Sequence, residues 1–363
     1  MRIAEPKAEA ARVLAVCNAC RYCEQYCPAF QALEQRATFA SADVNYLANL
    51  CHGCGECLYA CQYAPPHEFA IDVPRTLAAA RVASYEQYAW PAQLAAAFRS
   101  MGSGAALLLA LGMTALLAGG TLALNAAALR GPVTGADFYA VVPHAVLAAL
   151  FGGVGLLVVL ALGTGVARCR RDFAAAAPPA AHRRAGSIAA ALHDAFTLRH
   201  LHVAGADCVT ALEVRTPWRR WLHHATAYGF VLCFAATCVA TLYHALGYPA
   251  PYAYTSGPVV LGTLGGAGLV IGTTGLLWLR RVRDPALTAP DQQRLDGTFT
   301  VLLLATAVTG LLLLALRSHA AMPALLLLHL GCVLALFVTL PYGKFVHGLY
   351  RLAALVKYRR EQE

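Results

Sequence analysis

Charged side chains are scarce in this sequence. Only 13% of its 363 residues are charged, whereas 59% are hydrophobic, and the mean hydropathy is +0.55. These values exclude an ordinary soluble domain of this size and predict a membrane protein. The opening segment MRIAEPKAEAARVLAVC has acidic residues where a secretory leader would have a basic and then an apolar stretch, so no signal peptide is expected.

Apolar runs of spanning length are missing from the first hundred residues, which hold eight of the 13 cysteines. Residues 1–85 are therefore expected to form a soluble domain. The linker at 86–104 is predicted either to lie along the membrane surface or to be a plain connection. Because thiols stay reduced in the cytosol, the cysteine-rich domain is expected on the cytoplasmic side.

Six apolar segments long enough to cross a bilayer follow, at 105–124, 139–165, 223–246, 257–279, 298–316 and 323–341. They predict two transmembrane helices within 105–165, a cytoplasmic loop at 166–220, four more helices within 221–350 and a tail at 351–363. Arginines concentrate in the long loop and after the fourth segment. By the positive-inside rule, both termini are expected on the cytoplasmic side of the membrane.

The net charge of +9 does not predict nucleic-acid binding, because the basic residues cluster beside apolar segments instead of forming one basic face. The glycine-rich stretch 261–275 resembles a nucleotide fingerprint only superficially. It lies inside an apolar segment and follows no strand, so close helix packing through small residues is predicted there.

The eight N-terminal cysteines form two runs with the spacing C-x2-C-x2-C-x3-C, which is typical of [4Fe-4S] binding. In two-cluster ferredoxins the fourth cysteine of each run binds the other cluster. One predicted centre therefore has Cys17, Cys20, Cys23 and Cys61 as ligands. The second predicted centre has Cys51, Cys54, Cys57 and Cys27.

Structural zinc is the alternative for these cysteines, but zinc sites normally use two C-x2-C pairs. One departure from the ferredoxin pattern is Gln62, which stands where a proline is usual after the fourth cysteine. The segment between Cys27 and Cys51 has a helical pattern. The predicted fold is therefore all-α: a helical ferredoxin-like domain followed by a six-helix transmembrane haem bundle.

Six histidines lie in or at the ends of the apolar segments, where polar side chains are costly and thus functional candidates. The predicted topology places three toward the cytoplasm and three toward the outside, namely His223, His224 and His347, and His144, His244 and His329. If the sixth helix continues through PYGKF, His329 and His347 share one face about 27 Å apart. On the third helix, the side chains of His223 and His244 point in directions that differ by about 60° around the helix axis.

Because the third and sixth helices run in opposite directions, two histidine pairs are expected. One joins His223 or His224 to His347, and the other joins His244 to His329. Each pair is predicted to hold one b-type haem through axial imidazoles, which gives one or two haems. Four basic residues are candidates for contacts with the haem propionates, although each is also explained as a membrane anchor. They are Arg219, Arg220, Lys344 and Arg317.

Several phrases resemble the tricarballylate or citrate utilisation protein B family, namely CQYAPPHEFAIDVP, RRWLHHATAYGFVLCFAAT, LGTLGGAGLVIGTTGLLWL and LPYGKFVHGLYRLAAL. The likeness covers most of residues 15–357. It implies an iron-sulfur domain coupled to a membrane haem domain, which takes electrons from a flavin dehydrogenase oxidising tricarballylate to cis-aconitate. The paired-histidine helix also has a more general likeness to the membrane subunit of respiratory nitrate reductase.

The expected function is an oxidoreductase component. Electrons would enter from a cytosolic FAD-dependent dehydrogenase, pass through two [4Fe-4S] clusters and a haem, and reach a membrane quinone. No catalytic residue is assigned, but candidates for the quinone site near the inner face are Asp296, Tyr228, Tyr342 and Lys344.

Two alternatives remain from the sequence. The first is a redox-sensing accessory of citrate transport, although no broken inverted repeats of a transporter are recognisable. The second is a thiol or heterodisulfide reductase subunit with Cys208 as the reactive thiol. Cys208 with His200 and His202 is also a candidate ligand set.

Overall fold

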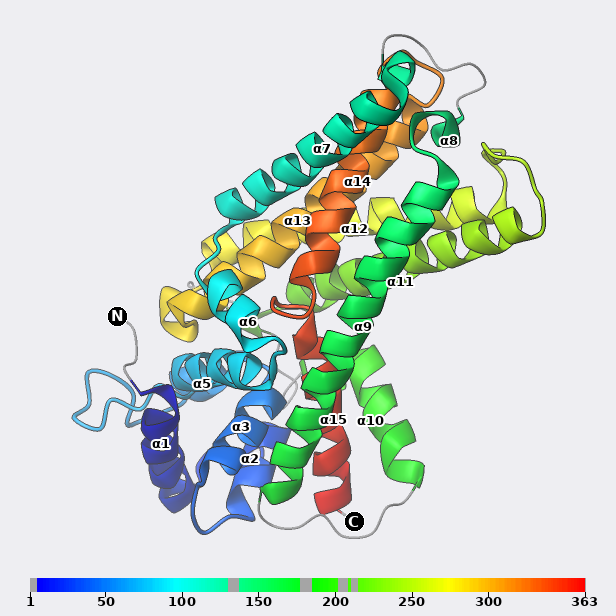
Figure 1. Ribbon diagram of the computed structural model, residues 1–363. Coiled ribbons are helices and arrows are strands. Elements are labelled where there is room, and N and C mark those ends of the chain that lie inside the picture. The colour runs from blue at the N-terminus through cyan, green and yellow to red at the C-terminus, as the bar shows by residue number, and fades with distance from the viewer. Residues whose placement is uncertain (1–4, 130–136, 177–184, 202–207, 210–214, 363) are drawn as a thin grey trace.

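The structure is a computed structural model that describes residues 5–129, 137–176, 185–201, 208–209 and 215–362. The regular elements of the described residues are helices, apart from two short strands. β1 (Cys208–Val209) pairs antiparallel with β2 (Arg215–Thr216). The predicted all-α class is confirmed. Figure 1 shows long helices in the upper part of the molecule and a group of shorter helices beneath them.

The lower group begins with five helices: α1 (Pro6–Cys20), α2 (Pro28–Glu34), α3 (Ser41–Leu50), α4 (Glu56–Tyr59) and α5 (Val73–Tyr88). α2 and α3 lie between the two cysteine runs, which confirms the helical prediction for that segment. The cysteines themselves lie at helix ends and in the connecting turns. α6 (Ala92–Arg99) then leads into the long helices.

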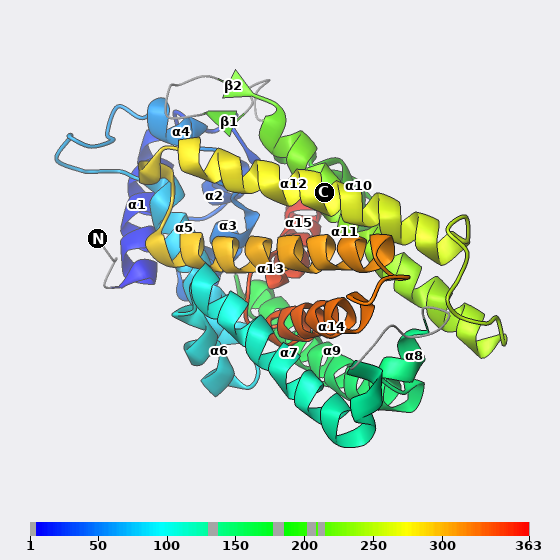
Figure 2. The same cartoon turned by 90° about the horizontal axis from the view of Figure 1, so that it is seen from above.

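Six helices of the described chain are long and apolar enough to cross a membrane, as predicted. They are α7 (Ser103–Asn125, extended by a 3-10 turn to Leu129), α9 (His144–Ala175), α11 (Trp218–Ala245), α12 (Gly257–Val282), α13 (Pro290–Ala315) and α14 (Met322–Thr339). A short helix, α8 (Phe138–Val141), precedes α9. Figure 2 shows α12, α13, α14 and α7 side by side in that order.

Glycines bring α11 and α12 together at close range. A Cβ atom at Gly229 would lie 2.8 Å from the backbone oxygen of Gly265, and one at Gly272 would lie 2.6 Å from the backbone nitrogen of Thr226. Neither position has room for a side chain. The prediction that the glycine-rich stretch serves helix packing is therefore confirmed.

Two helices differ from the expectation. α9 continues ten residues beyond the predicted end at 165, and its last turns are buried in the lower domain through Cys169 and Phe173. The sixth membrane helix does not continue through PYGKF. It ends at Thr339, because Pro341 lacks the backbone N–H that a helix interior needs. A separate helix, α15 (Val346–Glu361), follows.

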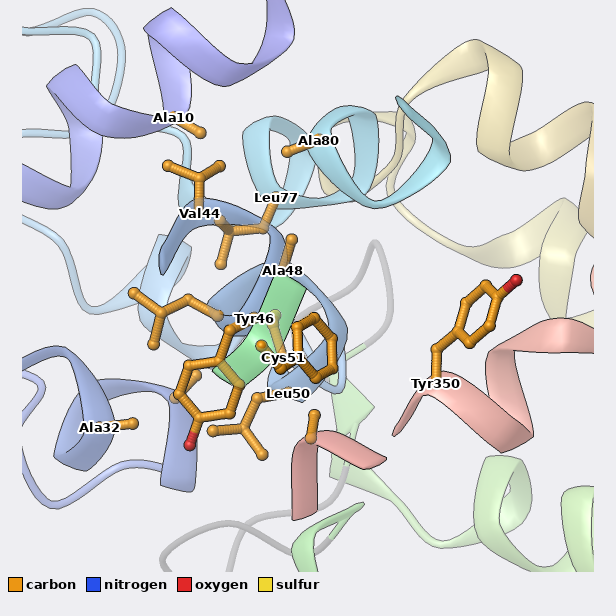
Figure 3. Close-up of a cluster of buried hydrophobic side chains, with 14 of the residues drawn as sticks. Ala10, Ala32, Val44, Tyr46, Ala48, Leu50, Cys51, Leu77, Ala80 and Tyr350 are labelled. Atoms are coloured by element: carbon orange, nitrogen blue, oxygen red, sulfur yellow. The ribbon is translucent and has the colours of Figure 1, made fainter. Parts of the chain in front are cut away.

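α15 is an integral part of the cysteine-rich domain. The predicted boundary between membrane part and tail, at 350, falls inside this helix, and Tyr350 belongs to the core formed by α1, α3 and α5. Figure 3 shows Tyr350 together with Tyr46, Leu77 and Cys51 of that core. The long connection also contributes α10 (Ala185–Thr197), which packs against α15.

The last turn of α15 is held by a buried ionic network. Glu361, whose side chain is fully buried, accepts from Arg36 at 2.7 Å, from Tyr46 at 2.8 Å and from Lys357 at 2.9 Å. Three donors thus neutralise and solvate one carboxylate. A buried charge is tolerated only with such partners.

Candidate functional site

The structure places the eight cysteines around two pockets: Cys61 lines one with Cys17, Cys20 and Cys23, and Cys27 lines the other with Cys51, Cys54 and Cys57. Burial raises the pKa of Cys17 to about 12, and neighbouring Cys23, Cys61 and Cys20 add to the shift. Burial also raises the pKa of Cys27, with Cys51 and Cys54 as the neighbouring thiols. The pKa of Cys57 is raised by burial and then by Cys54, Cys51 and Cys27.

The fourth cysteine of each run therefore lies with the first three of the other. We call Cys17, Cys20, Cys23 and Cys61 the distal group, and Cys27, Cys51, Cys54 and Cys57 the proximal group. Each group lines one pocket, and Cys57 of the proximal group lines both pockets. Crowded, buried thiols resist ionisation, so a cationic cofactor that binds thiolates suits both groups.

No three cysteine, histidine, aspartate or glutamate side chains of the described residues converge in a way that suits a single metal ion. A cubane cluster makes a different demand, because each thiolate binds a different iron. Its four sulfur atoms therefore surround the cluster and do not meet at one atom. Groups of four thiols spread around a pocket fit that requirement.

The proximal group lies against the ends of the long helices through its loop, residues 51–55, which we call the proximal loop. Two arginines donate to the backbone oxygen of Gly53: Arg219 of α11 at 2.9 Å and Arg283, directly after α12, at 2.5 Å. Two more donate to the backbone oxygen of Cys51: Arg81 of α5 at 2.7 Å and Arg351 of α15 at 2.6 Å.

Backbone geometry explains the two glycines of the proximal loop. Gly53 and Gly55 have φ angles of +60° and +99°, a region that side chains disfavour. A Cβ atom at Gly55 would also lie 2.6 Å from the side chain of Leu287. The Gly53 N–H lies 3.4 Å from the sulfur of Cys51, which is the kind of contact that stabilises a thiolate ligand.

His223 of α11 and His347 of α15 meet one helical turn away from the arginines that hold this loop. Their ring centroids are 6.0 Å apart and their planes make an angle of 75°. Nδ1 of His347 donates to the backbone oxygen of Lys344 at 2.7 Å. Burial and the nearby positive charge of Lys344 hold the pKa of His347 well below its usual value.

The ring of His347 is thus neutral, and its proton is on Nδ1, because a carbonyl oxygen only accepts. Nε2 then has the free lone pair that a metal ligand needs. Nδ1 of His223 is buried and has no hydrogen-bond partner among the described residues. This pair fits the demand of a haem iron for two axial imidazoles.

The other predicted histidines lie elsewhere. His224 stacks on Tyr228, with ring centroids 5.6 Å apart, on a side that does not face His347. The expected pairing of His244 with His329 is not seen. His244 stacks on His144 at 3.8 Å, and His329 contacts α13, where Thr309 Oγ1 lies 3.1 Å from its Nδ1. The cause is helix packing, because α11 packs on α12 whereas α14 packs on α7 and α13.

Two of the four quinone candidates form an ion pair. Lys344 Nζ lies 2.7 Å from Asp296 Oδ1, and burial lowers the pKa of Lys344 to about 8. Tyr342 instead donates to the backbone of Trp90 at 3.1 Å, and Tyr228 donates to the backbone of Phe196 at 3.0 Å. The Lys344–Asp296 pair adjoins the His223–His347 pair through the Lys344 backbone.

The arginines considered for haem propionates have protein partners. Arg219 binds the proximal loop, and Arg317 donates to the backbone of Tyr252 at 2.7 Å and lies over the Tyr254 ring. His202 lies outside the described residues, as does the side chain of Cys208. His200 instead contacts the ring of His52, with centroids 5.8 Å apart, and Asp194 at 3.2 Å.

Sequence reasoning considered Arg219 only as a candidate for a propionate contact, and it missed Arg81, Arg283 and Arg351 as residues that contact the proximal loop. One signal was present: Arg219 precedes His223 by four residues, and Arg351 follows His347 by four. On a helix, residues four apart share a face. The arginines therefore point toward the same region as the histidine pair. Nothing in the sequence indicated Arg81 or Arg283, because their contacts join distant segments.

Comparisons with known proteins agree with this division of the chain. Residues 10–87 match the family described as citrate utilization protein B Fer4-like domain, and residues 96–363 match citrate utilization protein B. A relative from Escherichia coli named citrate utilization protein B is 49% identical over 364 residues, covering 99% of this chain and 94% of the relative. No solved structure matches the chain.

Proposed function

Because the chain belongs to the citrate utilization protein B family, with a Fer4-like domain joined to six membrane-crossing helices, we propose that it is a membrane-bound electron-transfer protein. It takes electrons from a cytosolic FAD-dependent dehydrogenase, with tricarballylate as the predicted substrate of that enzyme. It passes them to a quinone in the bacterial inner membrane. Both termini face the cytoplasm in this proposal.

The observation that supports the proposal is a continuous arrangement of candidate ligands. The loop of the proximal group contacts the ends of α11 and α12, and the proximal group shares Cys57 with the pocket of the distal group. Arg219 and Arg351 join the proximal loop to the His223–His347 pair, since each lies one helical turn from a histidine of the pair and donates to the loop. A two-centre ferredoxin domain next to a membrane histidine pair needs this arrangement.

The residues are assigned as follows. The distal and proximal groups each hold one [4Fe-4S] cluster, and His223 with His347 holds one b-type haem. When bound, these groups supply one-electron transfer. The protein fixes their positions: the arginines anchor the proximal loop, and the Lys344 backbone orients the imidazole of His347.

We place the quinone site at Lys344 and Asp296. The pair lies beside the His223–His347 pair and contains both a proton donor and an acceptor, which quinone reduction requires. The neighbouring Tyr342 and Phe98 rings are stacked, with centroids 5.3 Å apart, and present a flat apolar surface. A quinone ring suits such a surface.

The test is a spectrum with iron analysis of the purified full-length protein. We expect b-type haem bands, iron-sulfur absorption and about nine irons per chain, eight in two clusters and one in haem. Dithionite should reduce the haem, and a short-chain quinone should reoxidise it. A protein that contains zinc and no iron would contradict the proposal.

A further inference from the structure

The proximal loop is surrounded by more positive charge than its carbonyl groups need for hydrogen bonding. Four arginines from four different segments donate to this loop. Arg81 and Arg351 donate to the backbone oxygen of Cys51, and Arg219 and Arg283 donate to that of Gly53. A carbonyl oxygen is satisfied by one or two neutral donors. Placing four like-charged guanidinium groups together costs electrostatic energy, so the arrangement needs a compensating negative charge.

The arginines also act through the peptide groups of the loop. The Cys51, His52 and Gly53 carbonyls all accept from guanidinium groups, with Arg219 also 3.4 Å from the backbone oxygen of His52. Each such contact polarises the N–H of the next residue. The Gly53 N–H already lies 3.4 Å from the Cys51 sulfur. Positive potential is thus transmitted toward the thiolates by charge and by dipoles.

Among the described residues, one contact of this kind is seen at the distal group. Arg21, whose side chain is exposed, donates to the backbone oxygen of Asn18 at 3.2 Å. Glu56 lines the pocket of the proximal group beside Cys57, and its carboxylate is one negative charge against four arginines. Nearby cations make the addition of an electron more favourable, because the reduced cluster has one more negative charge.

From this asymmetry we infer that Arg81, Arg219, Arg283 and Arg351 are positioning residues that make the proximal centre the one of higher reduction potential. The inference rests on the proposed function, since it requires clusters at both groups. Its consequence is that an electron in the domain resides at the proximal centre, next to the histidine pair. Transfer between the centres oxidises one and reduces the other, with no bond broken and no proton needed.

The burial of Arg351 does not remove its charge. An arginine side chain stays protonated at neutral pH in any protein environment. The four positive charges are therefore present under the conditions in which the protein works. Lysine at the same positions would keep the charge but lose the planar fork that reaches a carbonyl oxygen.

The test is a redox titration of the full-length protein in detergent, with dithionite as the electron donor and electron paramagnetic resonance as the readout. The variant Cys20→Ala identifies the distal signal by its loss. We expect the proximal signal to have the higher potential in the unaltered protein. In Arg219→Gln, Arg283→Gln and Arg351→Gln, the reduction potential of the proximal centre should fall by about 59 mV. For one electron this corresponds to about a tenfold change in the equilibrium constant of reduction.

Arg99→Gln is the matched control. Arg99 is 47% exposed and pairs with Glu86 on the surface, so its loss should leave both potentials unchanged. Arg351→Lys should keep most of the proximal potential. If one glutamine variant loses its proximal cluster, the other two decide, because the arginines come from different segments.

Unchanged proximal potentials in the glutamine variants, or a proximal centre of lower potential than the distal one, would overturn the inference and leave the proposed function intact. Absence of any iron-sulfur signal from the unaltered, iron-supplied protein would instead overturn the proposed function. The two failures are therefore distinguishable in one experiment.

Discussion

The ring centroids of His223 and His347 lie 6.0 Å apart, although the two residues are on different helices and 124 positions apart in the chain. The neighbouring His224 points elsewhere and stacks on Tyr228. Of the two adjacent histidines, the structure thus places His223 beside His347 and His224 beside Tyr228.

The first prediction concerns this selection. His347→Ala should abolish haem binding, because a single imidazole remains, and should leave the iron-sulfur signals in place. His224→Ala should retain the haem. The haem content per chain is measured by the pyridine haemochrome assay. Full haem retention in His347→Ala would reassign the ligand.

The second prediction separates the crossed cysteine assignment from a sequential one. Cys61→Ala should remove the distal signal, and Cys27→Ala should remove the proximal signal, each with a loss of about four irons per chain. Cys238→Ala is the control, because this exposed cysteine of α11 belongs to neither group. Loss of the proximal signal in Cys61→Ala would show that each run binds its own cluster.

The third prediction tests the quinone site. The double variant Asp296→Asn, Lys344→Gln should lower quinol formation at least about tenfold, because both members of the proton-donating pair are replaced by neutral groups. Haem reduction by dithionite should not change. Tyr228→Phe is the control, since its hydroxyl contacts the backbone of Phe196 in α10. Unaltered quinol formation in the double variant would place the site elsewhere.

The fourth prediction concerns helix packing. Gly229→Ala should destabilise the protein by about 1–3 kcal/mol, because a Cβ atom would lie 2.8 Å from the backbone of α12. Gly152→Ala in α9 is the control, since nothing lies within 4 Å of the position that its Cβ atom would take. Thermal unfolding in detergent measures the difference. Equal melting temperatures would show that α11 and α12 can separate at no cost.

The fifth prediction addresses the buried carboxylate of α15. Glu361→Gln should destabilise the cysteine-rich domain by about 3–5 kcal/mol, because Arg36 and Lys357 both lose a buried carboxylate partner. Arg36 keeps its ion pair with Asp43. Glu68→Gln, on the exposed loop after the second cysteine run, should have no measurable effect. The unfolding midpoint in urea, followed by loss of iron-sulfur absorption, is the measurement.

The fold was largely predictable because its signals are local. Runs of apolar residues specify the six long helices, and cysteine spacing specifies two groups of four. The end of α14 at Thr339 was also encoded, by Pro341, but the apolar pattern continued past it. The expected His244–His329 pair is not formed because α11 packs on α12, whereas α14 packs on α7 and α13, and apolar patterns do not specify which helices become neighbours.

The contacts of the proximal loop were not predictable, because they depend on how distant segments meet. Arg81 and Arg283 are 202 positions apart, yet they contact carbonyl groups two residues apart in one turn. Arginines next to apolar segments are also expected as membrane anchors. Charge patterning alone could not distinguish an anchor from a residue that holds a loop.

The position of α15 has a consequence for biosynthesis. Ribosomes release the cysteine runs first and this helix last, yet Tyr350 and Glu361 complete the core around those runs. The N-terminal domain therefore cannot finish folding until the whole membrane part has been translated and inserted. A finished scaffold for the clusters that we propose is therefore available only after insertion.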